Sequence, residues 1–169
     1  MEFLEKDLEE IIYLSDKDKL QERGLYLTGK LKRQLRIGNY GIADLIEIKK
    51  PYYHNKRFYK GCINIIELKK DKIGVSTFFQ ALNYLQGVKT YLEDRKSGDL
   101  FNYKITLIGK GADTNSSFVF LGDIFNNEIN DCDIIEHHKT KVELFTYKYG
   151  VEGVEFTQMF DYNLKNKGF

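Results

Sequence analysis

The sequence predicts an α/β domain with a central mixed β-sheet, flanked by helices at about 3–14 and 77–94. The apolar patterns follow the order helix, strands, helix, strands, rather than a regular strand–helix repeat. The 169 residues suffice for one hydrophobic core, and 42% hydrophobic with 30% charged residues is an ordinary globular composition. We therefore expect a single domain over 1–169, with a core at about 3–110 and a β-rich C-terminal extension at about 112–160.

In the first half of the chain, apolar residues at helical spacing predict the amphipathic helix at about 3–14. Residues 25–37 mix leucines with basic residues, which is typical of strands with one solvent-exposed face. The turn Gly38-Asn39-Tyr40-Gly41 precedes a strand at about 41–50, and a second, more apolar strand follows at about 61–70.

In the second half, Ser76 is a candidate N-cap for the helix at 77–94. The rest of the chain is rich in short strand patterns. We expect strands at about 102–109, 117–121, 133–137, 141–149 and 153–158.

Composition limits the partners and the compartment. A net charge of +1 neither favours nor excludes nucleic acid, so any electrostatic argument must be local. The two cysteines, Cys62 and Cys132, do not form a disulfide framework. The acidic N-terminus is unlike a signal peptide, and no run approaches the roughly twenty apolar residues of a membrane span. We expect a cytoplasmic protein without a membrane partner.

Two carboxylates and a lysine carry the chemistry that the sequence suggests. Glu67 and Lys69 end an apolar strand, two residues apart, so they share one face of it. Asp44 lies on the preceding strand. Asp44, Glu67 and the backbone carbonyl of Leu68 are oxygen ligands of the kind that Mg²⁺ prefers. Lys69 can orient or deprotonate water, or offset phosphate charge. The alternative is a strand end with solvated charges.

Three segments resemble the signature of the PD-(D/E)XK nuclease superfamily: Gly41-Ile42-Ala43-Asp44, Glu67-Leu68-Lys69, and Gln80-Ala81-Leu82-Asn83-Tyr84. The resemblance covers about 3–95 and is closest to the catalytic domain of archaeal and actinobacterial mismatch- or single-strand-specific endonucleases. It implies a restriction-endonuclease-like core and an endonuclease that hydrolyses DNA with Mg²⁺, for which Mn²⁺ should substitute. It also implies that Asp44 and Glu67 are metal ligands and that Lys69 is the catalytic lysine.

The resemblance extends to the flanking helices. It implies that Gln80 and Tyr84 contact DNA phosphate or steady the site, although Tyr84 can equally be a core residue. Glu5, in Glu5-Lys6-Asp7-Leu8-Glu9, would supply a further catalytic carboxylate. Glu9 lies one turn away on the same helical face and is an alternative to Glu5.

The chain also departs from the family pattern. Ala43 stands where the superfamily name has proline, and the connection from Asp44 to Glu67 is longer than the tight hairpin of the closest relatives. The 169 residues contain no separate N-terminal DNA-binding domain. The substrate therefore stays open among single-stranded, branched and duplex DNA, and RNA.

The connection at 49–60, which we call the arm, contains basic and aromatic residues and no acid. We expect its cations to bind phosphates and its tyrosines to stack on unpaired bases, feeding substrate toward the site. The alternative is a solvated hairpin tip whose lysines deter edge pairing. A second basic set before Asp44 would line the same cleft. The predicted DNA-binding residues besides Tyr84 are Lys49, Lys50, Tyr52, Tyr53, Lys56, Arg57, Lys60, Arg33 and Arg36.

Two other classes of function remain. One is a nucleic-acid-binding module that keeps the fold and does not cut. In the other, the region at about 112–160 binds a partner in a larger DNA repair, replication or defence complex. We also consider a homodimer.

Overall fold

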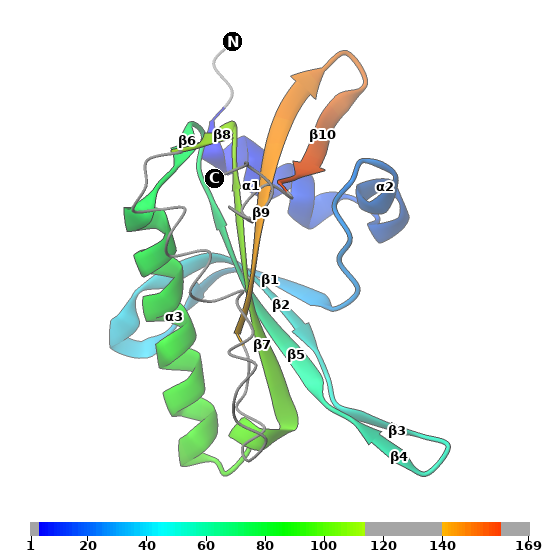
Figure 1. Ribbon diagram of the computed structural model, residues 1–169, viewed down its shortest axis with the longest axis vertical. Coiled ribbons are helices and arrows are strands. Elements are labelled where there is room, and N and C mark those ends of the chain that lie inside the picture. Colours follow the sequence, from blue (N-terminus) through cyan, green and yellow to red (C-terminus); the bar gives the residue numbers. More distant parts are fainter. Residues whose placement is uncertain (1–3, 114–139, 160–169) are drawn as a thin grey trace, which may run out of the picture.

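A six-stranded mixed β-sheet forms the centre of the computed structural model, which describes residues 4–113 and 140–159 (Figure 1). The sequence prediction of an α/β fold with a mixed central sheet is confirmed. The middle strands β5, β7 and β9 are parallel, and the other neighbours are antiparallel. In spatial order the strands are β1 (Lys30–Arg36), β2 (Ile42–Lys49), β5 (Gly61–Leu68), β7 (Phe101–Gly109), β9 (Thr140–Gly150) and β10 (Gly153–Gln158).

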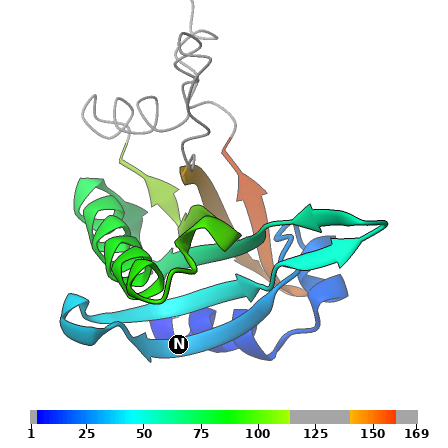
Figure 2. The same cartoon turned by 90° about the horizontal axis from the view of Figure 1, so that it is seen from below.

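Helices cover both faces of this sheet (Figure 2). α3 (Val75–Asp94) lies on one face and connects the parallel strands β5 and β7, as a crossover helix must. α1 (Glu5–Leu14) lies on the other face, followed by the short α2 (Lys17–Glu22). Two 3₁₀ turns, Gly38–Tyr40 and Gly98–Leu100, precede β2 and β7.

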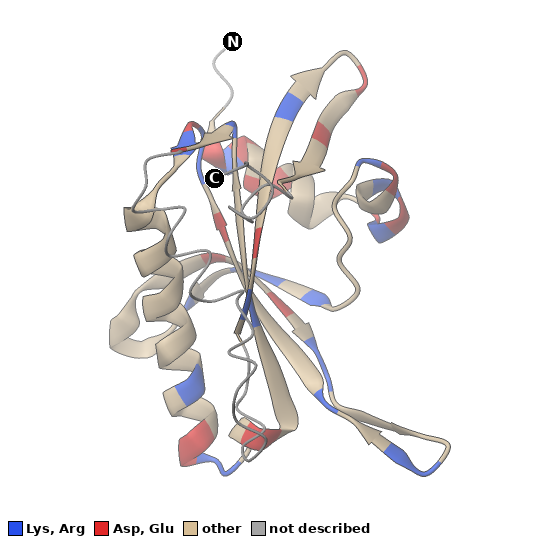
Figure 3. Cartoon of the chain, viewed as in Figure 1, with Lys and Arg blue, Asp and Glu red and all other residues tan. Residues whose placement is uncertain are grey.

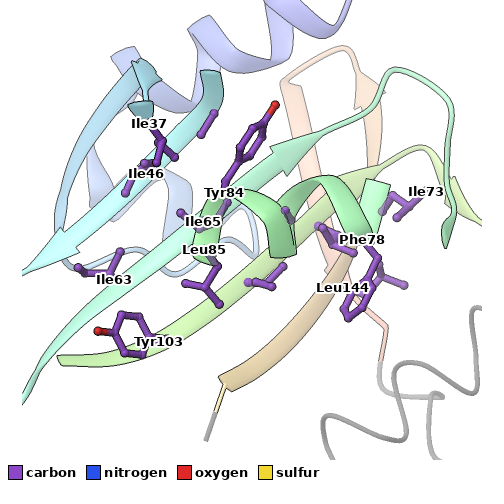
Figure 4. Close-up of a cluster of buried hydrophobic side chains, with 14 residues drawn as sticks. Ile37, Ile46, Ile63, Ile65, Ile73, Phe78, Tyr84, Leu85, Tyr103 and Leu144 are labelled. Atoms are coloured by element: carbon purple, nitrogen blue, oxygen red, sulfur yellow. The ribbon is translucent and has the colours of Figure 1, made fainter. Parts of the chain in front are cut away.

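Each face of the sheet has its own hydrophobic core. Alternate residues of β5 divide between them: Ile63 and Ile65 pack beneath α3, whereas Ile66 and Leu68 pack beneath α1. Figure 4 shows the α3 core, with Tyr84 and Leu85 of the helix among isoleucines of the sheet. Because both faces are buried, β5 is a nearly continuous apolar run rather than an alternating one.

Smaller elements extend from the sheet. The arm forms a two-stranded ribbon of β3 (Tyr52–His54) and β4 (Arg57–Tyr59), which projects from the end of β2 and β5 (Figure 1). At the other end of β5, the short strands β6 (Lys72–Ile73) and β8 (Gly111–Ala112) pair in parallel. The sequence did not predict this second pair.

Most of the predicted elements lie within a few residues of the observed ones, with two differences. Within 25–37 only Lys30–Arg36 is a strand. α3 begins at Val75 with Gly74 as its N-cap, so Ser76 is not the cap. The strands predicted at 117–121 and 133–137, together with Cys132, lie outside the described residues. Among the described helices, none has the length and apolar character needed to cross a membrane.

The C-terminal strands belong to the same sheet as the rest. β9 pairs with β7 from Thr140 to Thr146 and places Leu144 in the α3 core. Phe145 and Tyr147 of β9 and Phe156 of β10 lie in the α1 core. The described part of the predicted extension therefore completes both cores rather than adding to a finished domain.

Candidate active site

The candidate site begins where β2 and β5 separate. Their ladder runs from Lys49–Cys62 to Leu45–Ile66 and stops there, so Asp44 and Glu67 are the first residues beyond it on each strand. Asp44 still bridges the gap, because its Oδ2 accepts a hydrogen bond of 3.0 Å from the backbone amide of Leu68. The two carboxylates predicted as ligands, and the residue whose carbonyl was predicted as a third, thus lie together.

Glu67 is the most deeply buried member, with 1% of its surface exposed. Its Oε1 lies 3.2 Å from Nζ of Lys69, which confirms that the two side chains share a face. Its Oε2 is buried and has no hydrogen-bond partner among residues 4–113 and 140–159. Buried carboxylate oxygens are normally satisfied, so this one calls for an explanation.

Glu5 completes the group from α1. Its Oε1 lies 3.8 Å from Nζ of Lys69, and its Oε2 accepts a 3.3 Å hydrogen bond from the amide of Lys70. We call Glu5, Asp44, Glu67 and Lys69 the carboxylate–lysine cluster.

Glu9, the alternative to Glu5, has other partners. Nε of Arg33 lies 2.9 Å from Glu9 Oε1, as an ion pair outside hydrogen-bond geometry, and the Gln34 amide donates to Oε2. The guanidinium of Arg33 also lies 5.5 Å from the ring centroid of Tyr13. Arg33, predicted to bind DNA, is therefore engaged within the protein, and Glu5 is the residue that reaches Lys69.

Burial and mutual repulsion set the charges of the cluster. Burial, followed by the charge of Asp44, raises the pKa of Glu67 to about 8, despite the nearby ammonium of Lys69. Burial also raises the pKa of Asp44, and the Leu68 hydrogen bond and Lys69 offset this only in part. Burial lowers the pKa of Lys69, but Glu67 and Glu5 outweigh it, so that pKa lies above its ordinary value. Lys69 is thus a cation near neutral pH, and Glu67 holds a proton there.

The arrangement fits a divalent cation with few protein ligands. The buried Glu67, with its orphaned oxygen, and the half-buried Asp44 repel each other, and both would ionise readily if a cation lay between them. Among residues 4–113 and 140–159, no three Asp, Glu, His or Cys side chains converge as a metal-binding group. Mg²⁺ commonly uses one or two carboxylates and keeps several waters, so Asp44, Glu67 and the Leu68 carbonyl are a sufficient set.

Tyr84 and Gln80 lie on α3, and their contacts are with each other. Tyr84 is buried in the α3 core, and its hydroxyl accepts a 2.9 Å hydrogen bond from Nε2 of Gln80. Its ring packs against Gly41, where a Cβ would approach Tyr84 Cε1 to 2.8 Å. Tyr84 therefore takes the core role that the sequence left open. Gln80 is exposed, and its predicted contact with DNA phosphate stays a prediction.

The arm does not lie beside the cluster but at the other end of β2 and β5, and its expected role in guiding substrate toward the site stays a prediction. β2 and β5 are antiparallel, so the connection leaves β2 at Lys49 and enters β5 at Gly61, whereas Asp44 and Glu67 lie at the opposite ends. Figure 1 shows the arm projecting away from the β5–β6 junction. Of the second basic set, Arg36 is exposed opposite Ile42, two residues from Asp44.

Two residues that support the site were not predicted. The hydroxyl of Tyr147 on β9 donates a 3.0 Å hydrogen bond to the carbonyl of Lys70, whose amide binds Glu5. This contact joins β9 to the segment that follows β5. No local pattern signals it, because it depends on the position of a strand some seventy-seven residues later.

Comparison of the chain with protein-family models, with curated proteins and with solved structures gave no significant match. The resemblance to the nuclease superfamily thus rests on the three motifs and on the geometry described above.

Proposed function

We propose that this protein is a metal-dependent nuclease that hydrolyses phosphodiester bonds in DNA, on a restriction-endonuclease-like core. The observation that carries the proposal is the buried Glu67, with its unpartnered Oε2, beside Asp44 and Lys69 where two strands separate. The supporting features of the core are the mixed sheet, α1 bearing Glu5 and α3 following β5.

The residues divide the chemistry as follows. Asp44, Glu67 and the Leu68 carbonyl would hold a Mg²⁺ ion, which would supply Lewis-acid activation of a water and offset charge on the phosphate. Lys69, whose raised pKa keeps it protonated, orients the attacking water and offsets negative charge on the reacting phosphate. Glu5 fixes the Lys69 ammonium and the Lys70 amide. Attack by water is direct, without a covalent intermediate on the protein.

Cleavage of labelled DNA in Mg²⁺ or Mn²⁺ tests this assignment. Glu67→Ala or Lys69→Ala should lower the cleavage rate by about 10²–10³-fold, because the first removes a proposed metal ligand and the second removes a cation that stabilises the transition state. Matched controls are Glu155→Ala and Lys148→Ala, which change exposed residues of β10 and β9 and should cleave as the wild type does. Circular dichroism must show all four variants folded. Retained cleavage in both site variants would sink the assignment.

A nucleic-acid-binding module that does not cut is the second candidate. The observation in its favour is that the basic, aromatic arm lies at the other end of β2 and β5 from Asp44 and Glu67, so binding of nucleic acid by the arm does not require the cluster. Calorimetry with Mg²⁺ and Mn²⁺ separates the two functions: a nuclease should bind the ion, and Asp44→Ala should abolish that binding. DNA binding without any ion binding or cleavage would favour the silent module.

A further inference from the structure

The arm presents aromatic rings on both faces of a ribbon that has no core to fill. In the β3–β4 register, Tyr52 pairs with Tyr59, and Tyr53 pairs with Phe58 on the opposite face. The Tyr52 and Tyr59 rings are stacked with centroids 5.0 Å apart, and the Tyr53 and Phe58 centroids are 5.2 Å apart. Tyr53 is 77% exposed and the other three are 40–45% exposed. A hairpin tip that only linked two strands would not need four exposed aromatic rings.

The charge of the arm has one sign. Its cations include Lys56 and Arg57 at the tip, with Lys49, Lys50 and Lys60 at the base, and Figure 3 shows no acidic residue along it. Within the part of the chain that the structure describes, none of the five forms an ion pair. Lys49 instead lies 5.9 Å from the ring centroid of Tyr52. The arm is therefore complementary to a polyanion with flat apolar groups, and a second copy of the same arm would be repelled.

We propose that the arm binds unpaired nucleotides of the nucleic-acid substrate, at a fixed separation from the phosphate that is cut. Bases stack on the exposed rings of Tyr53 and Phe58, and Lys56 and Arg57 bind the phosphates. A base in a duplex already stacks on its neighbours, so it has no free face for such a ring. Exposed aromatics thus favour single-stranded over paired segments.

The separation follows from strand geometry. We place the end of the paired segment at Gly61, at the base of the arm, with the unpaired nucleotides continuing along the ribbon to Tyr53 and Phe58. Gly61 and Glu67 are six residues apart on β5, which is about 20 Å at roughly 3.3 Å per residue. One strand of a duplex advances about 3.4 Å per nucleotide, so this length spans about six nucleotides. The substrate class is then DNA with a single-stranded segment beside the cut site. This spacing, unlike the binding, rests on the proposed nuclease function.

Binding is tested first, without metal, by fluorescence anisotropy of the full chain with labelled oligonucleotides in EDTA. The wild type should bind single-stranded DNA at least tenfold more tightly than duplex of the same length. Tyr53→Ala and Phe58→Ala should each weaken single-strand binding by about tenfold, the effect of losing one stacked base. Tyr26→Ala, which removes a tyrosine of similar exposure outside the arm, should not. Equal affinity for duplex, or no effect of either arm variant, overturns the proposal.

The charges of the arm give a second, independent measurement. Lys56→Gln with Arg57→Gln should reduce the slope of log affinity against log salt by about 1.4, or roughly 0.7 for each lost phosphate contact on a single strand. An unchanged slope contradicts phosphate binding at the tip.

Cleavage then tests the spacing. With duplexes carrying a single-stranded overhang, the wild type should cut about six nucleotides from the junction, and Tyr53→Ala should blur or lose this position while still cutting. If Tyr53→Ala cuts at the same position as the wild type, the proposed spacing is wrong, whereas the nuclease assignment is unaffected. If the arm variants lose single-strand binding but neither they nor the wild type cleave DNA, the binding role of the arm is supported and the nuclease assignment is contradicted.

Discussion

Three buried glutamates differ in how their oxygens are satisfied. Glu47 accepts hydrogen bonds from the amides of Thr28 and Gly29 and from Nδ2 of Asn64. Glu9 is paired with Arg33 and Gln34. Glu67 is buried more deeply than either, yet one of its oxygens has no partner. Glu9 Oε1 at least meets the Arg33 guanidinium, whereas Glu67 Oε2 meets neither a donor nor a cation among the described residues, so folding alone explains the position of Glu67 least.

The pKa of Glu67 predicts how stability depends on pH. In the folded protein it is about 8, against an ordinary value of 4.5, so between these pH values the folded state holds one proton more than the unfolded state. The free energy of unfolding should therefore fall as pH rises through this window, by up to about 1.4 kcal/mol per pH unit from this group. Urea unfolding in EDTA at pH 5.5 and 8.5 measures the change.

Glu67→Gln is the matched variant for this measurement, because the amide has the same shape and does not titrate. The free energy of unfolding of this variant should depend less on pH than that of the wild type. The variant should be stabilised most, relative to the wild type, at pH 8.5. The raised pKa of Asp44 acts in the same direction and remains in the variant, so some pH dependence should persist. Identical pH profiles for the two proteins would show that Glu67 is ionised throughout.

At the residue level, sequence periodicity predicted the pairing of Glu67 with Lys69 and its proximity to Asp44. Both follow from local strand geometry and from the pairing of neighbouring strands. The choice between Glu5 and Glu9 could not be predicted, because both lie on one helical face and the angle of α1 over the sheet decides between them. The contact of Tyr147 with Lys70 is also non-local.

Among the elements, the turn into β2 is the one most closely tied to the site. Gly41 has φ +119° and ψ −155°, a region that is essentially restricted to glycine. Tyr84 of α3 occupies the space where a side chain at Gly41 would lie. The two ends of the motif resemblance, Gly41 and Tyr84, are thus in contact, which fixes the start of β2 at Ile42, two residues before Asp44.

Gly41→Ala should lower the free energy of unfolding by about 2–3 kcal/mol, since it adds backbone strain to a clash with a buried ring. Gly111→Ala in β8 is the control: its nearest neighbour to a new Cβ is a Lys72 side-chain atom at 3.8 Å, and its φ is ordinary. That variant should change stability by no more than about 0.5 kcal/mol. Chemical denaturation of both proteins measures the difference, and equal stabilities would contradict the role given to Gly41.

Two predictions about these elements, the extent of the strand within 25–37 and the place of the arm, differ from the structure for physical reasons. Leu25 and Leu27 are buried as the pattern suggests, but their segment is not a strand, because Glu47 binds the amides of Thr28 and Gly29 and holds it over the sheet. The arm was expected near the site from its composition. Antiparallel pairing of β2 with β5 requires the opposite, since a connection between two such strands leaves from the ends far from Asp44 and Glu67.

For the whole molecule, the order of strands makes the C-terminal part indispensable. β9 lies beside β7 in the parallel centre of the sheet, and β10 closes the edge over α2 and the segment after it. The backbone of Phe156 donates to the carbonyl of Arg23, and the Arg23 guanidinium donates to the carbonyl of Glu152. The segment after α2 and the β9–β10 hairpin are thus tied together at one sheet, so the described residues should unfold as one unit.

Phe156→Ala, in the last strand, tests whether the described residues unfold as one unit. Phe156 is 5% exposed in the α1 core, so its loss should cost about 3–5 kcal/mol, a large share of a typical domain's stability. Val151→Ala, at the fully exposed tip of the same hairpin, should be neutral within about 0.5 kcal/mol. Circular dichroism and tyrosine fluorescence should report the same single transition, shifted in Phe156→Ala. Two separate transitions, or equal stability of the two variants, would instead make β9 and β10 an independent unit added to a core at 3–110.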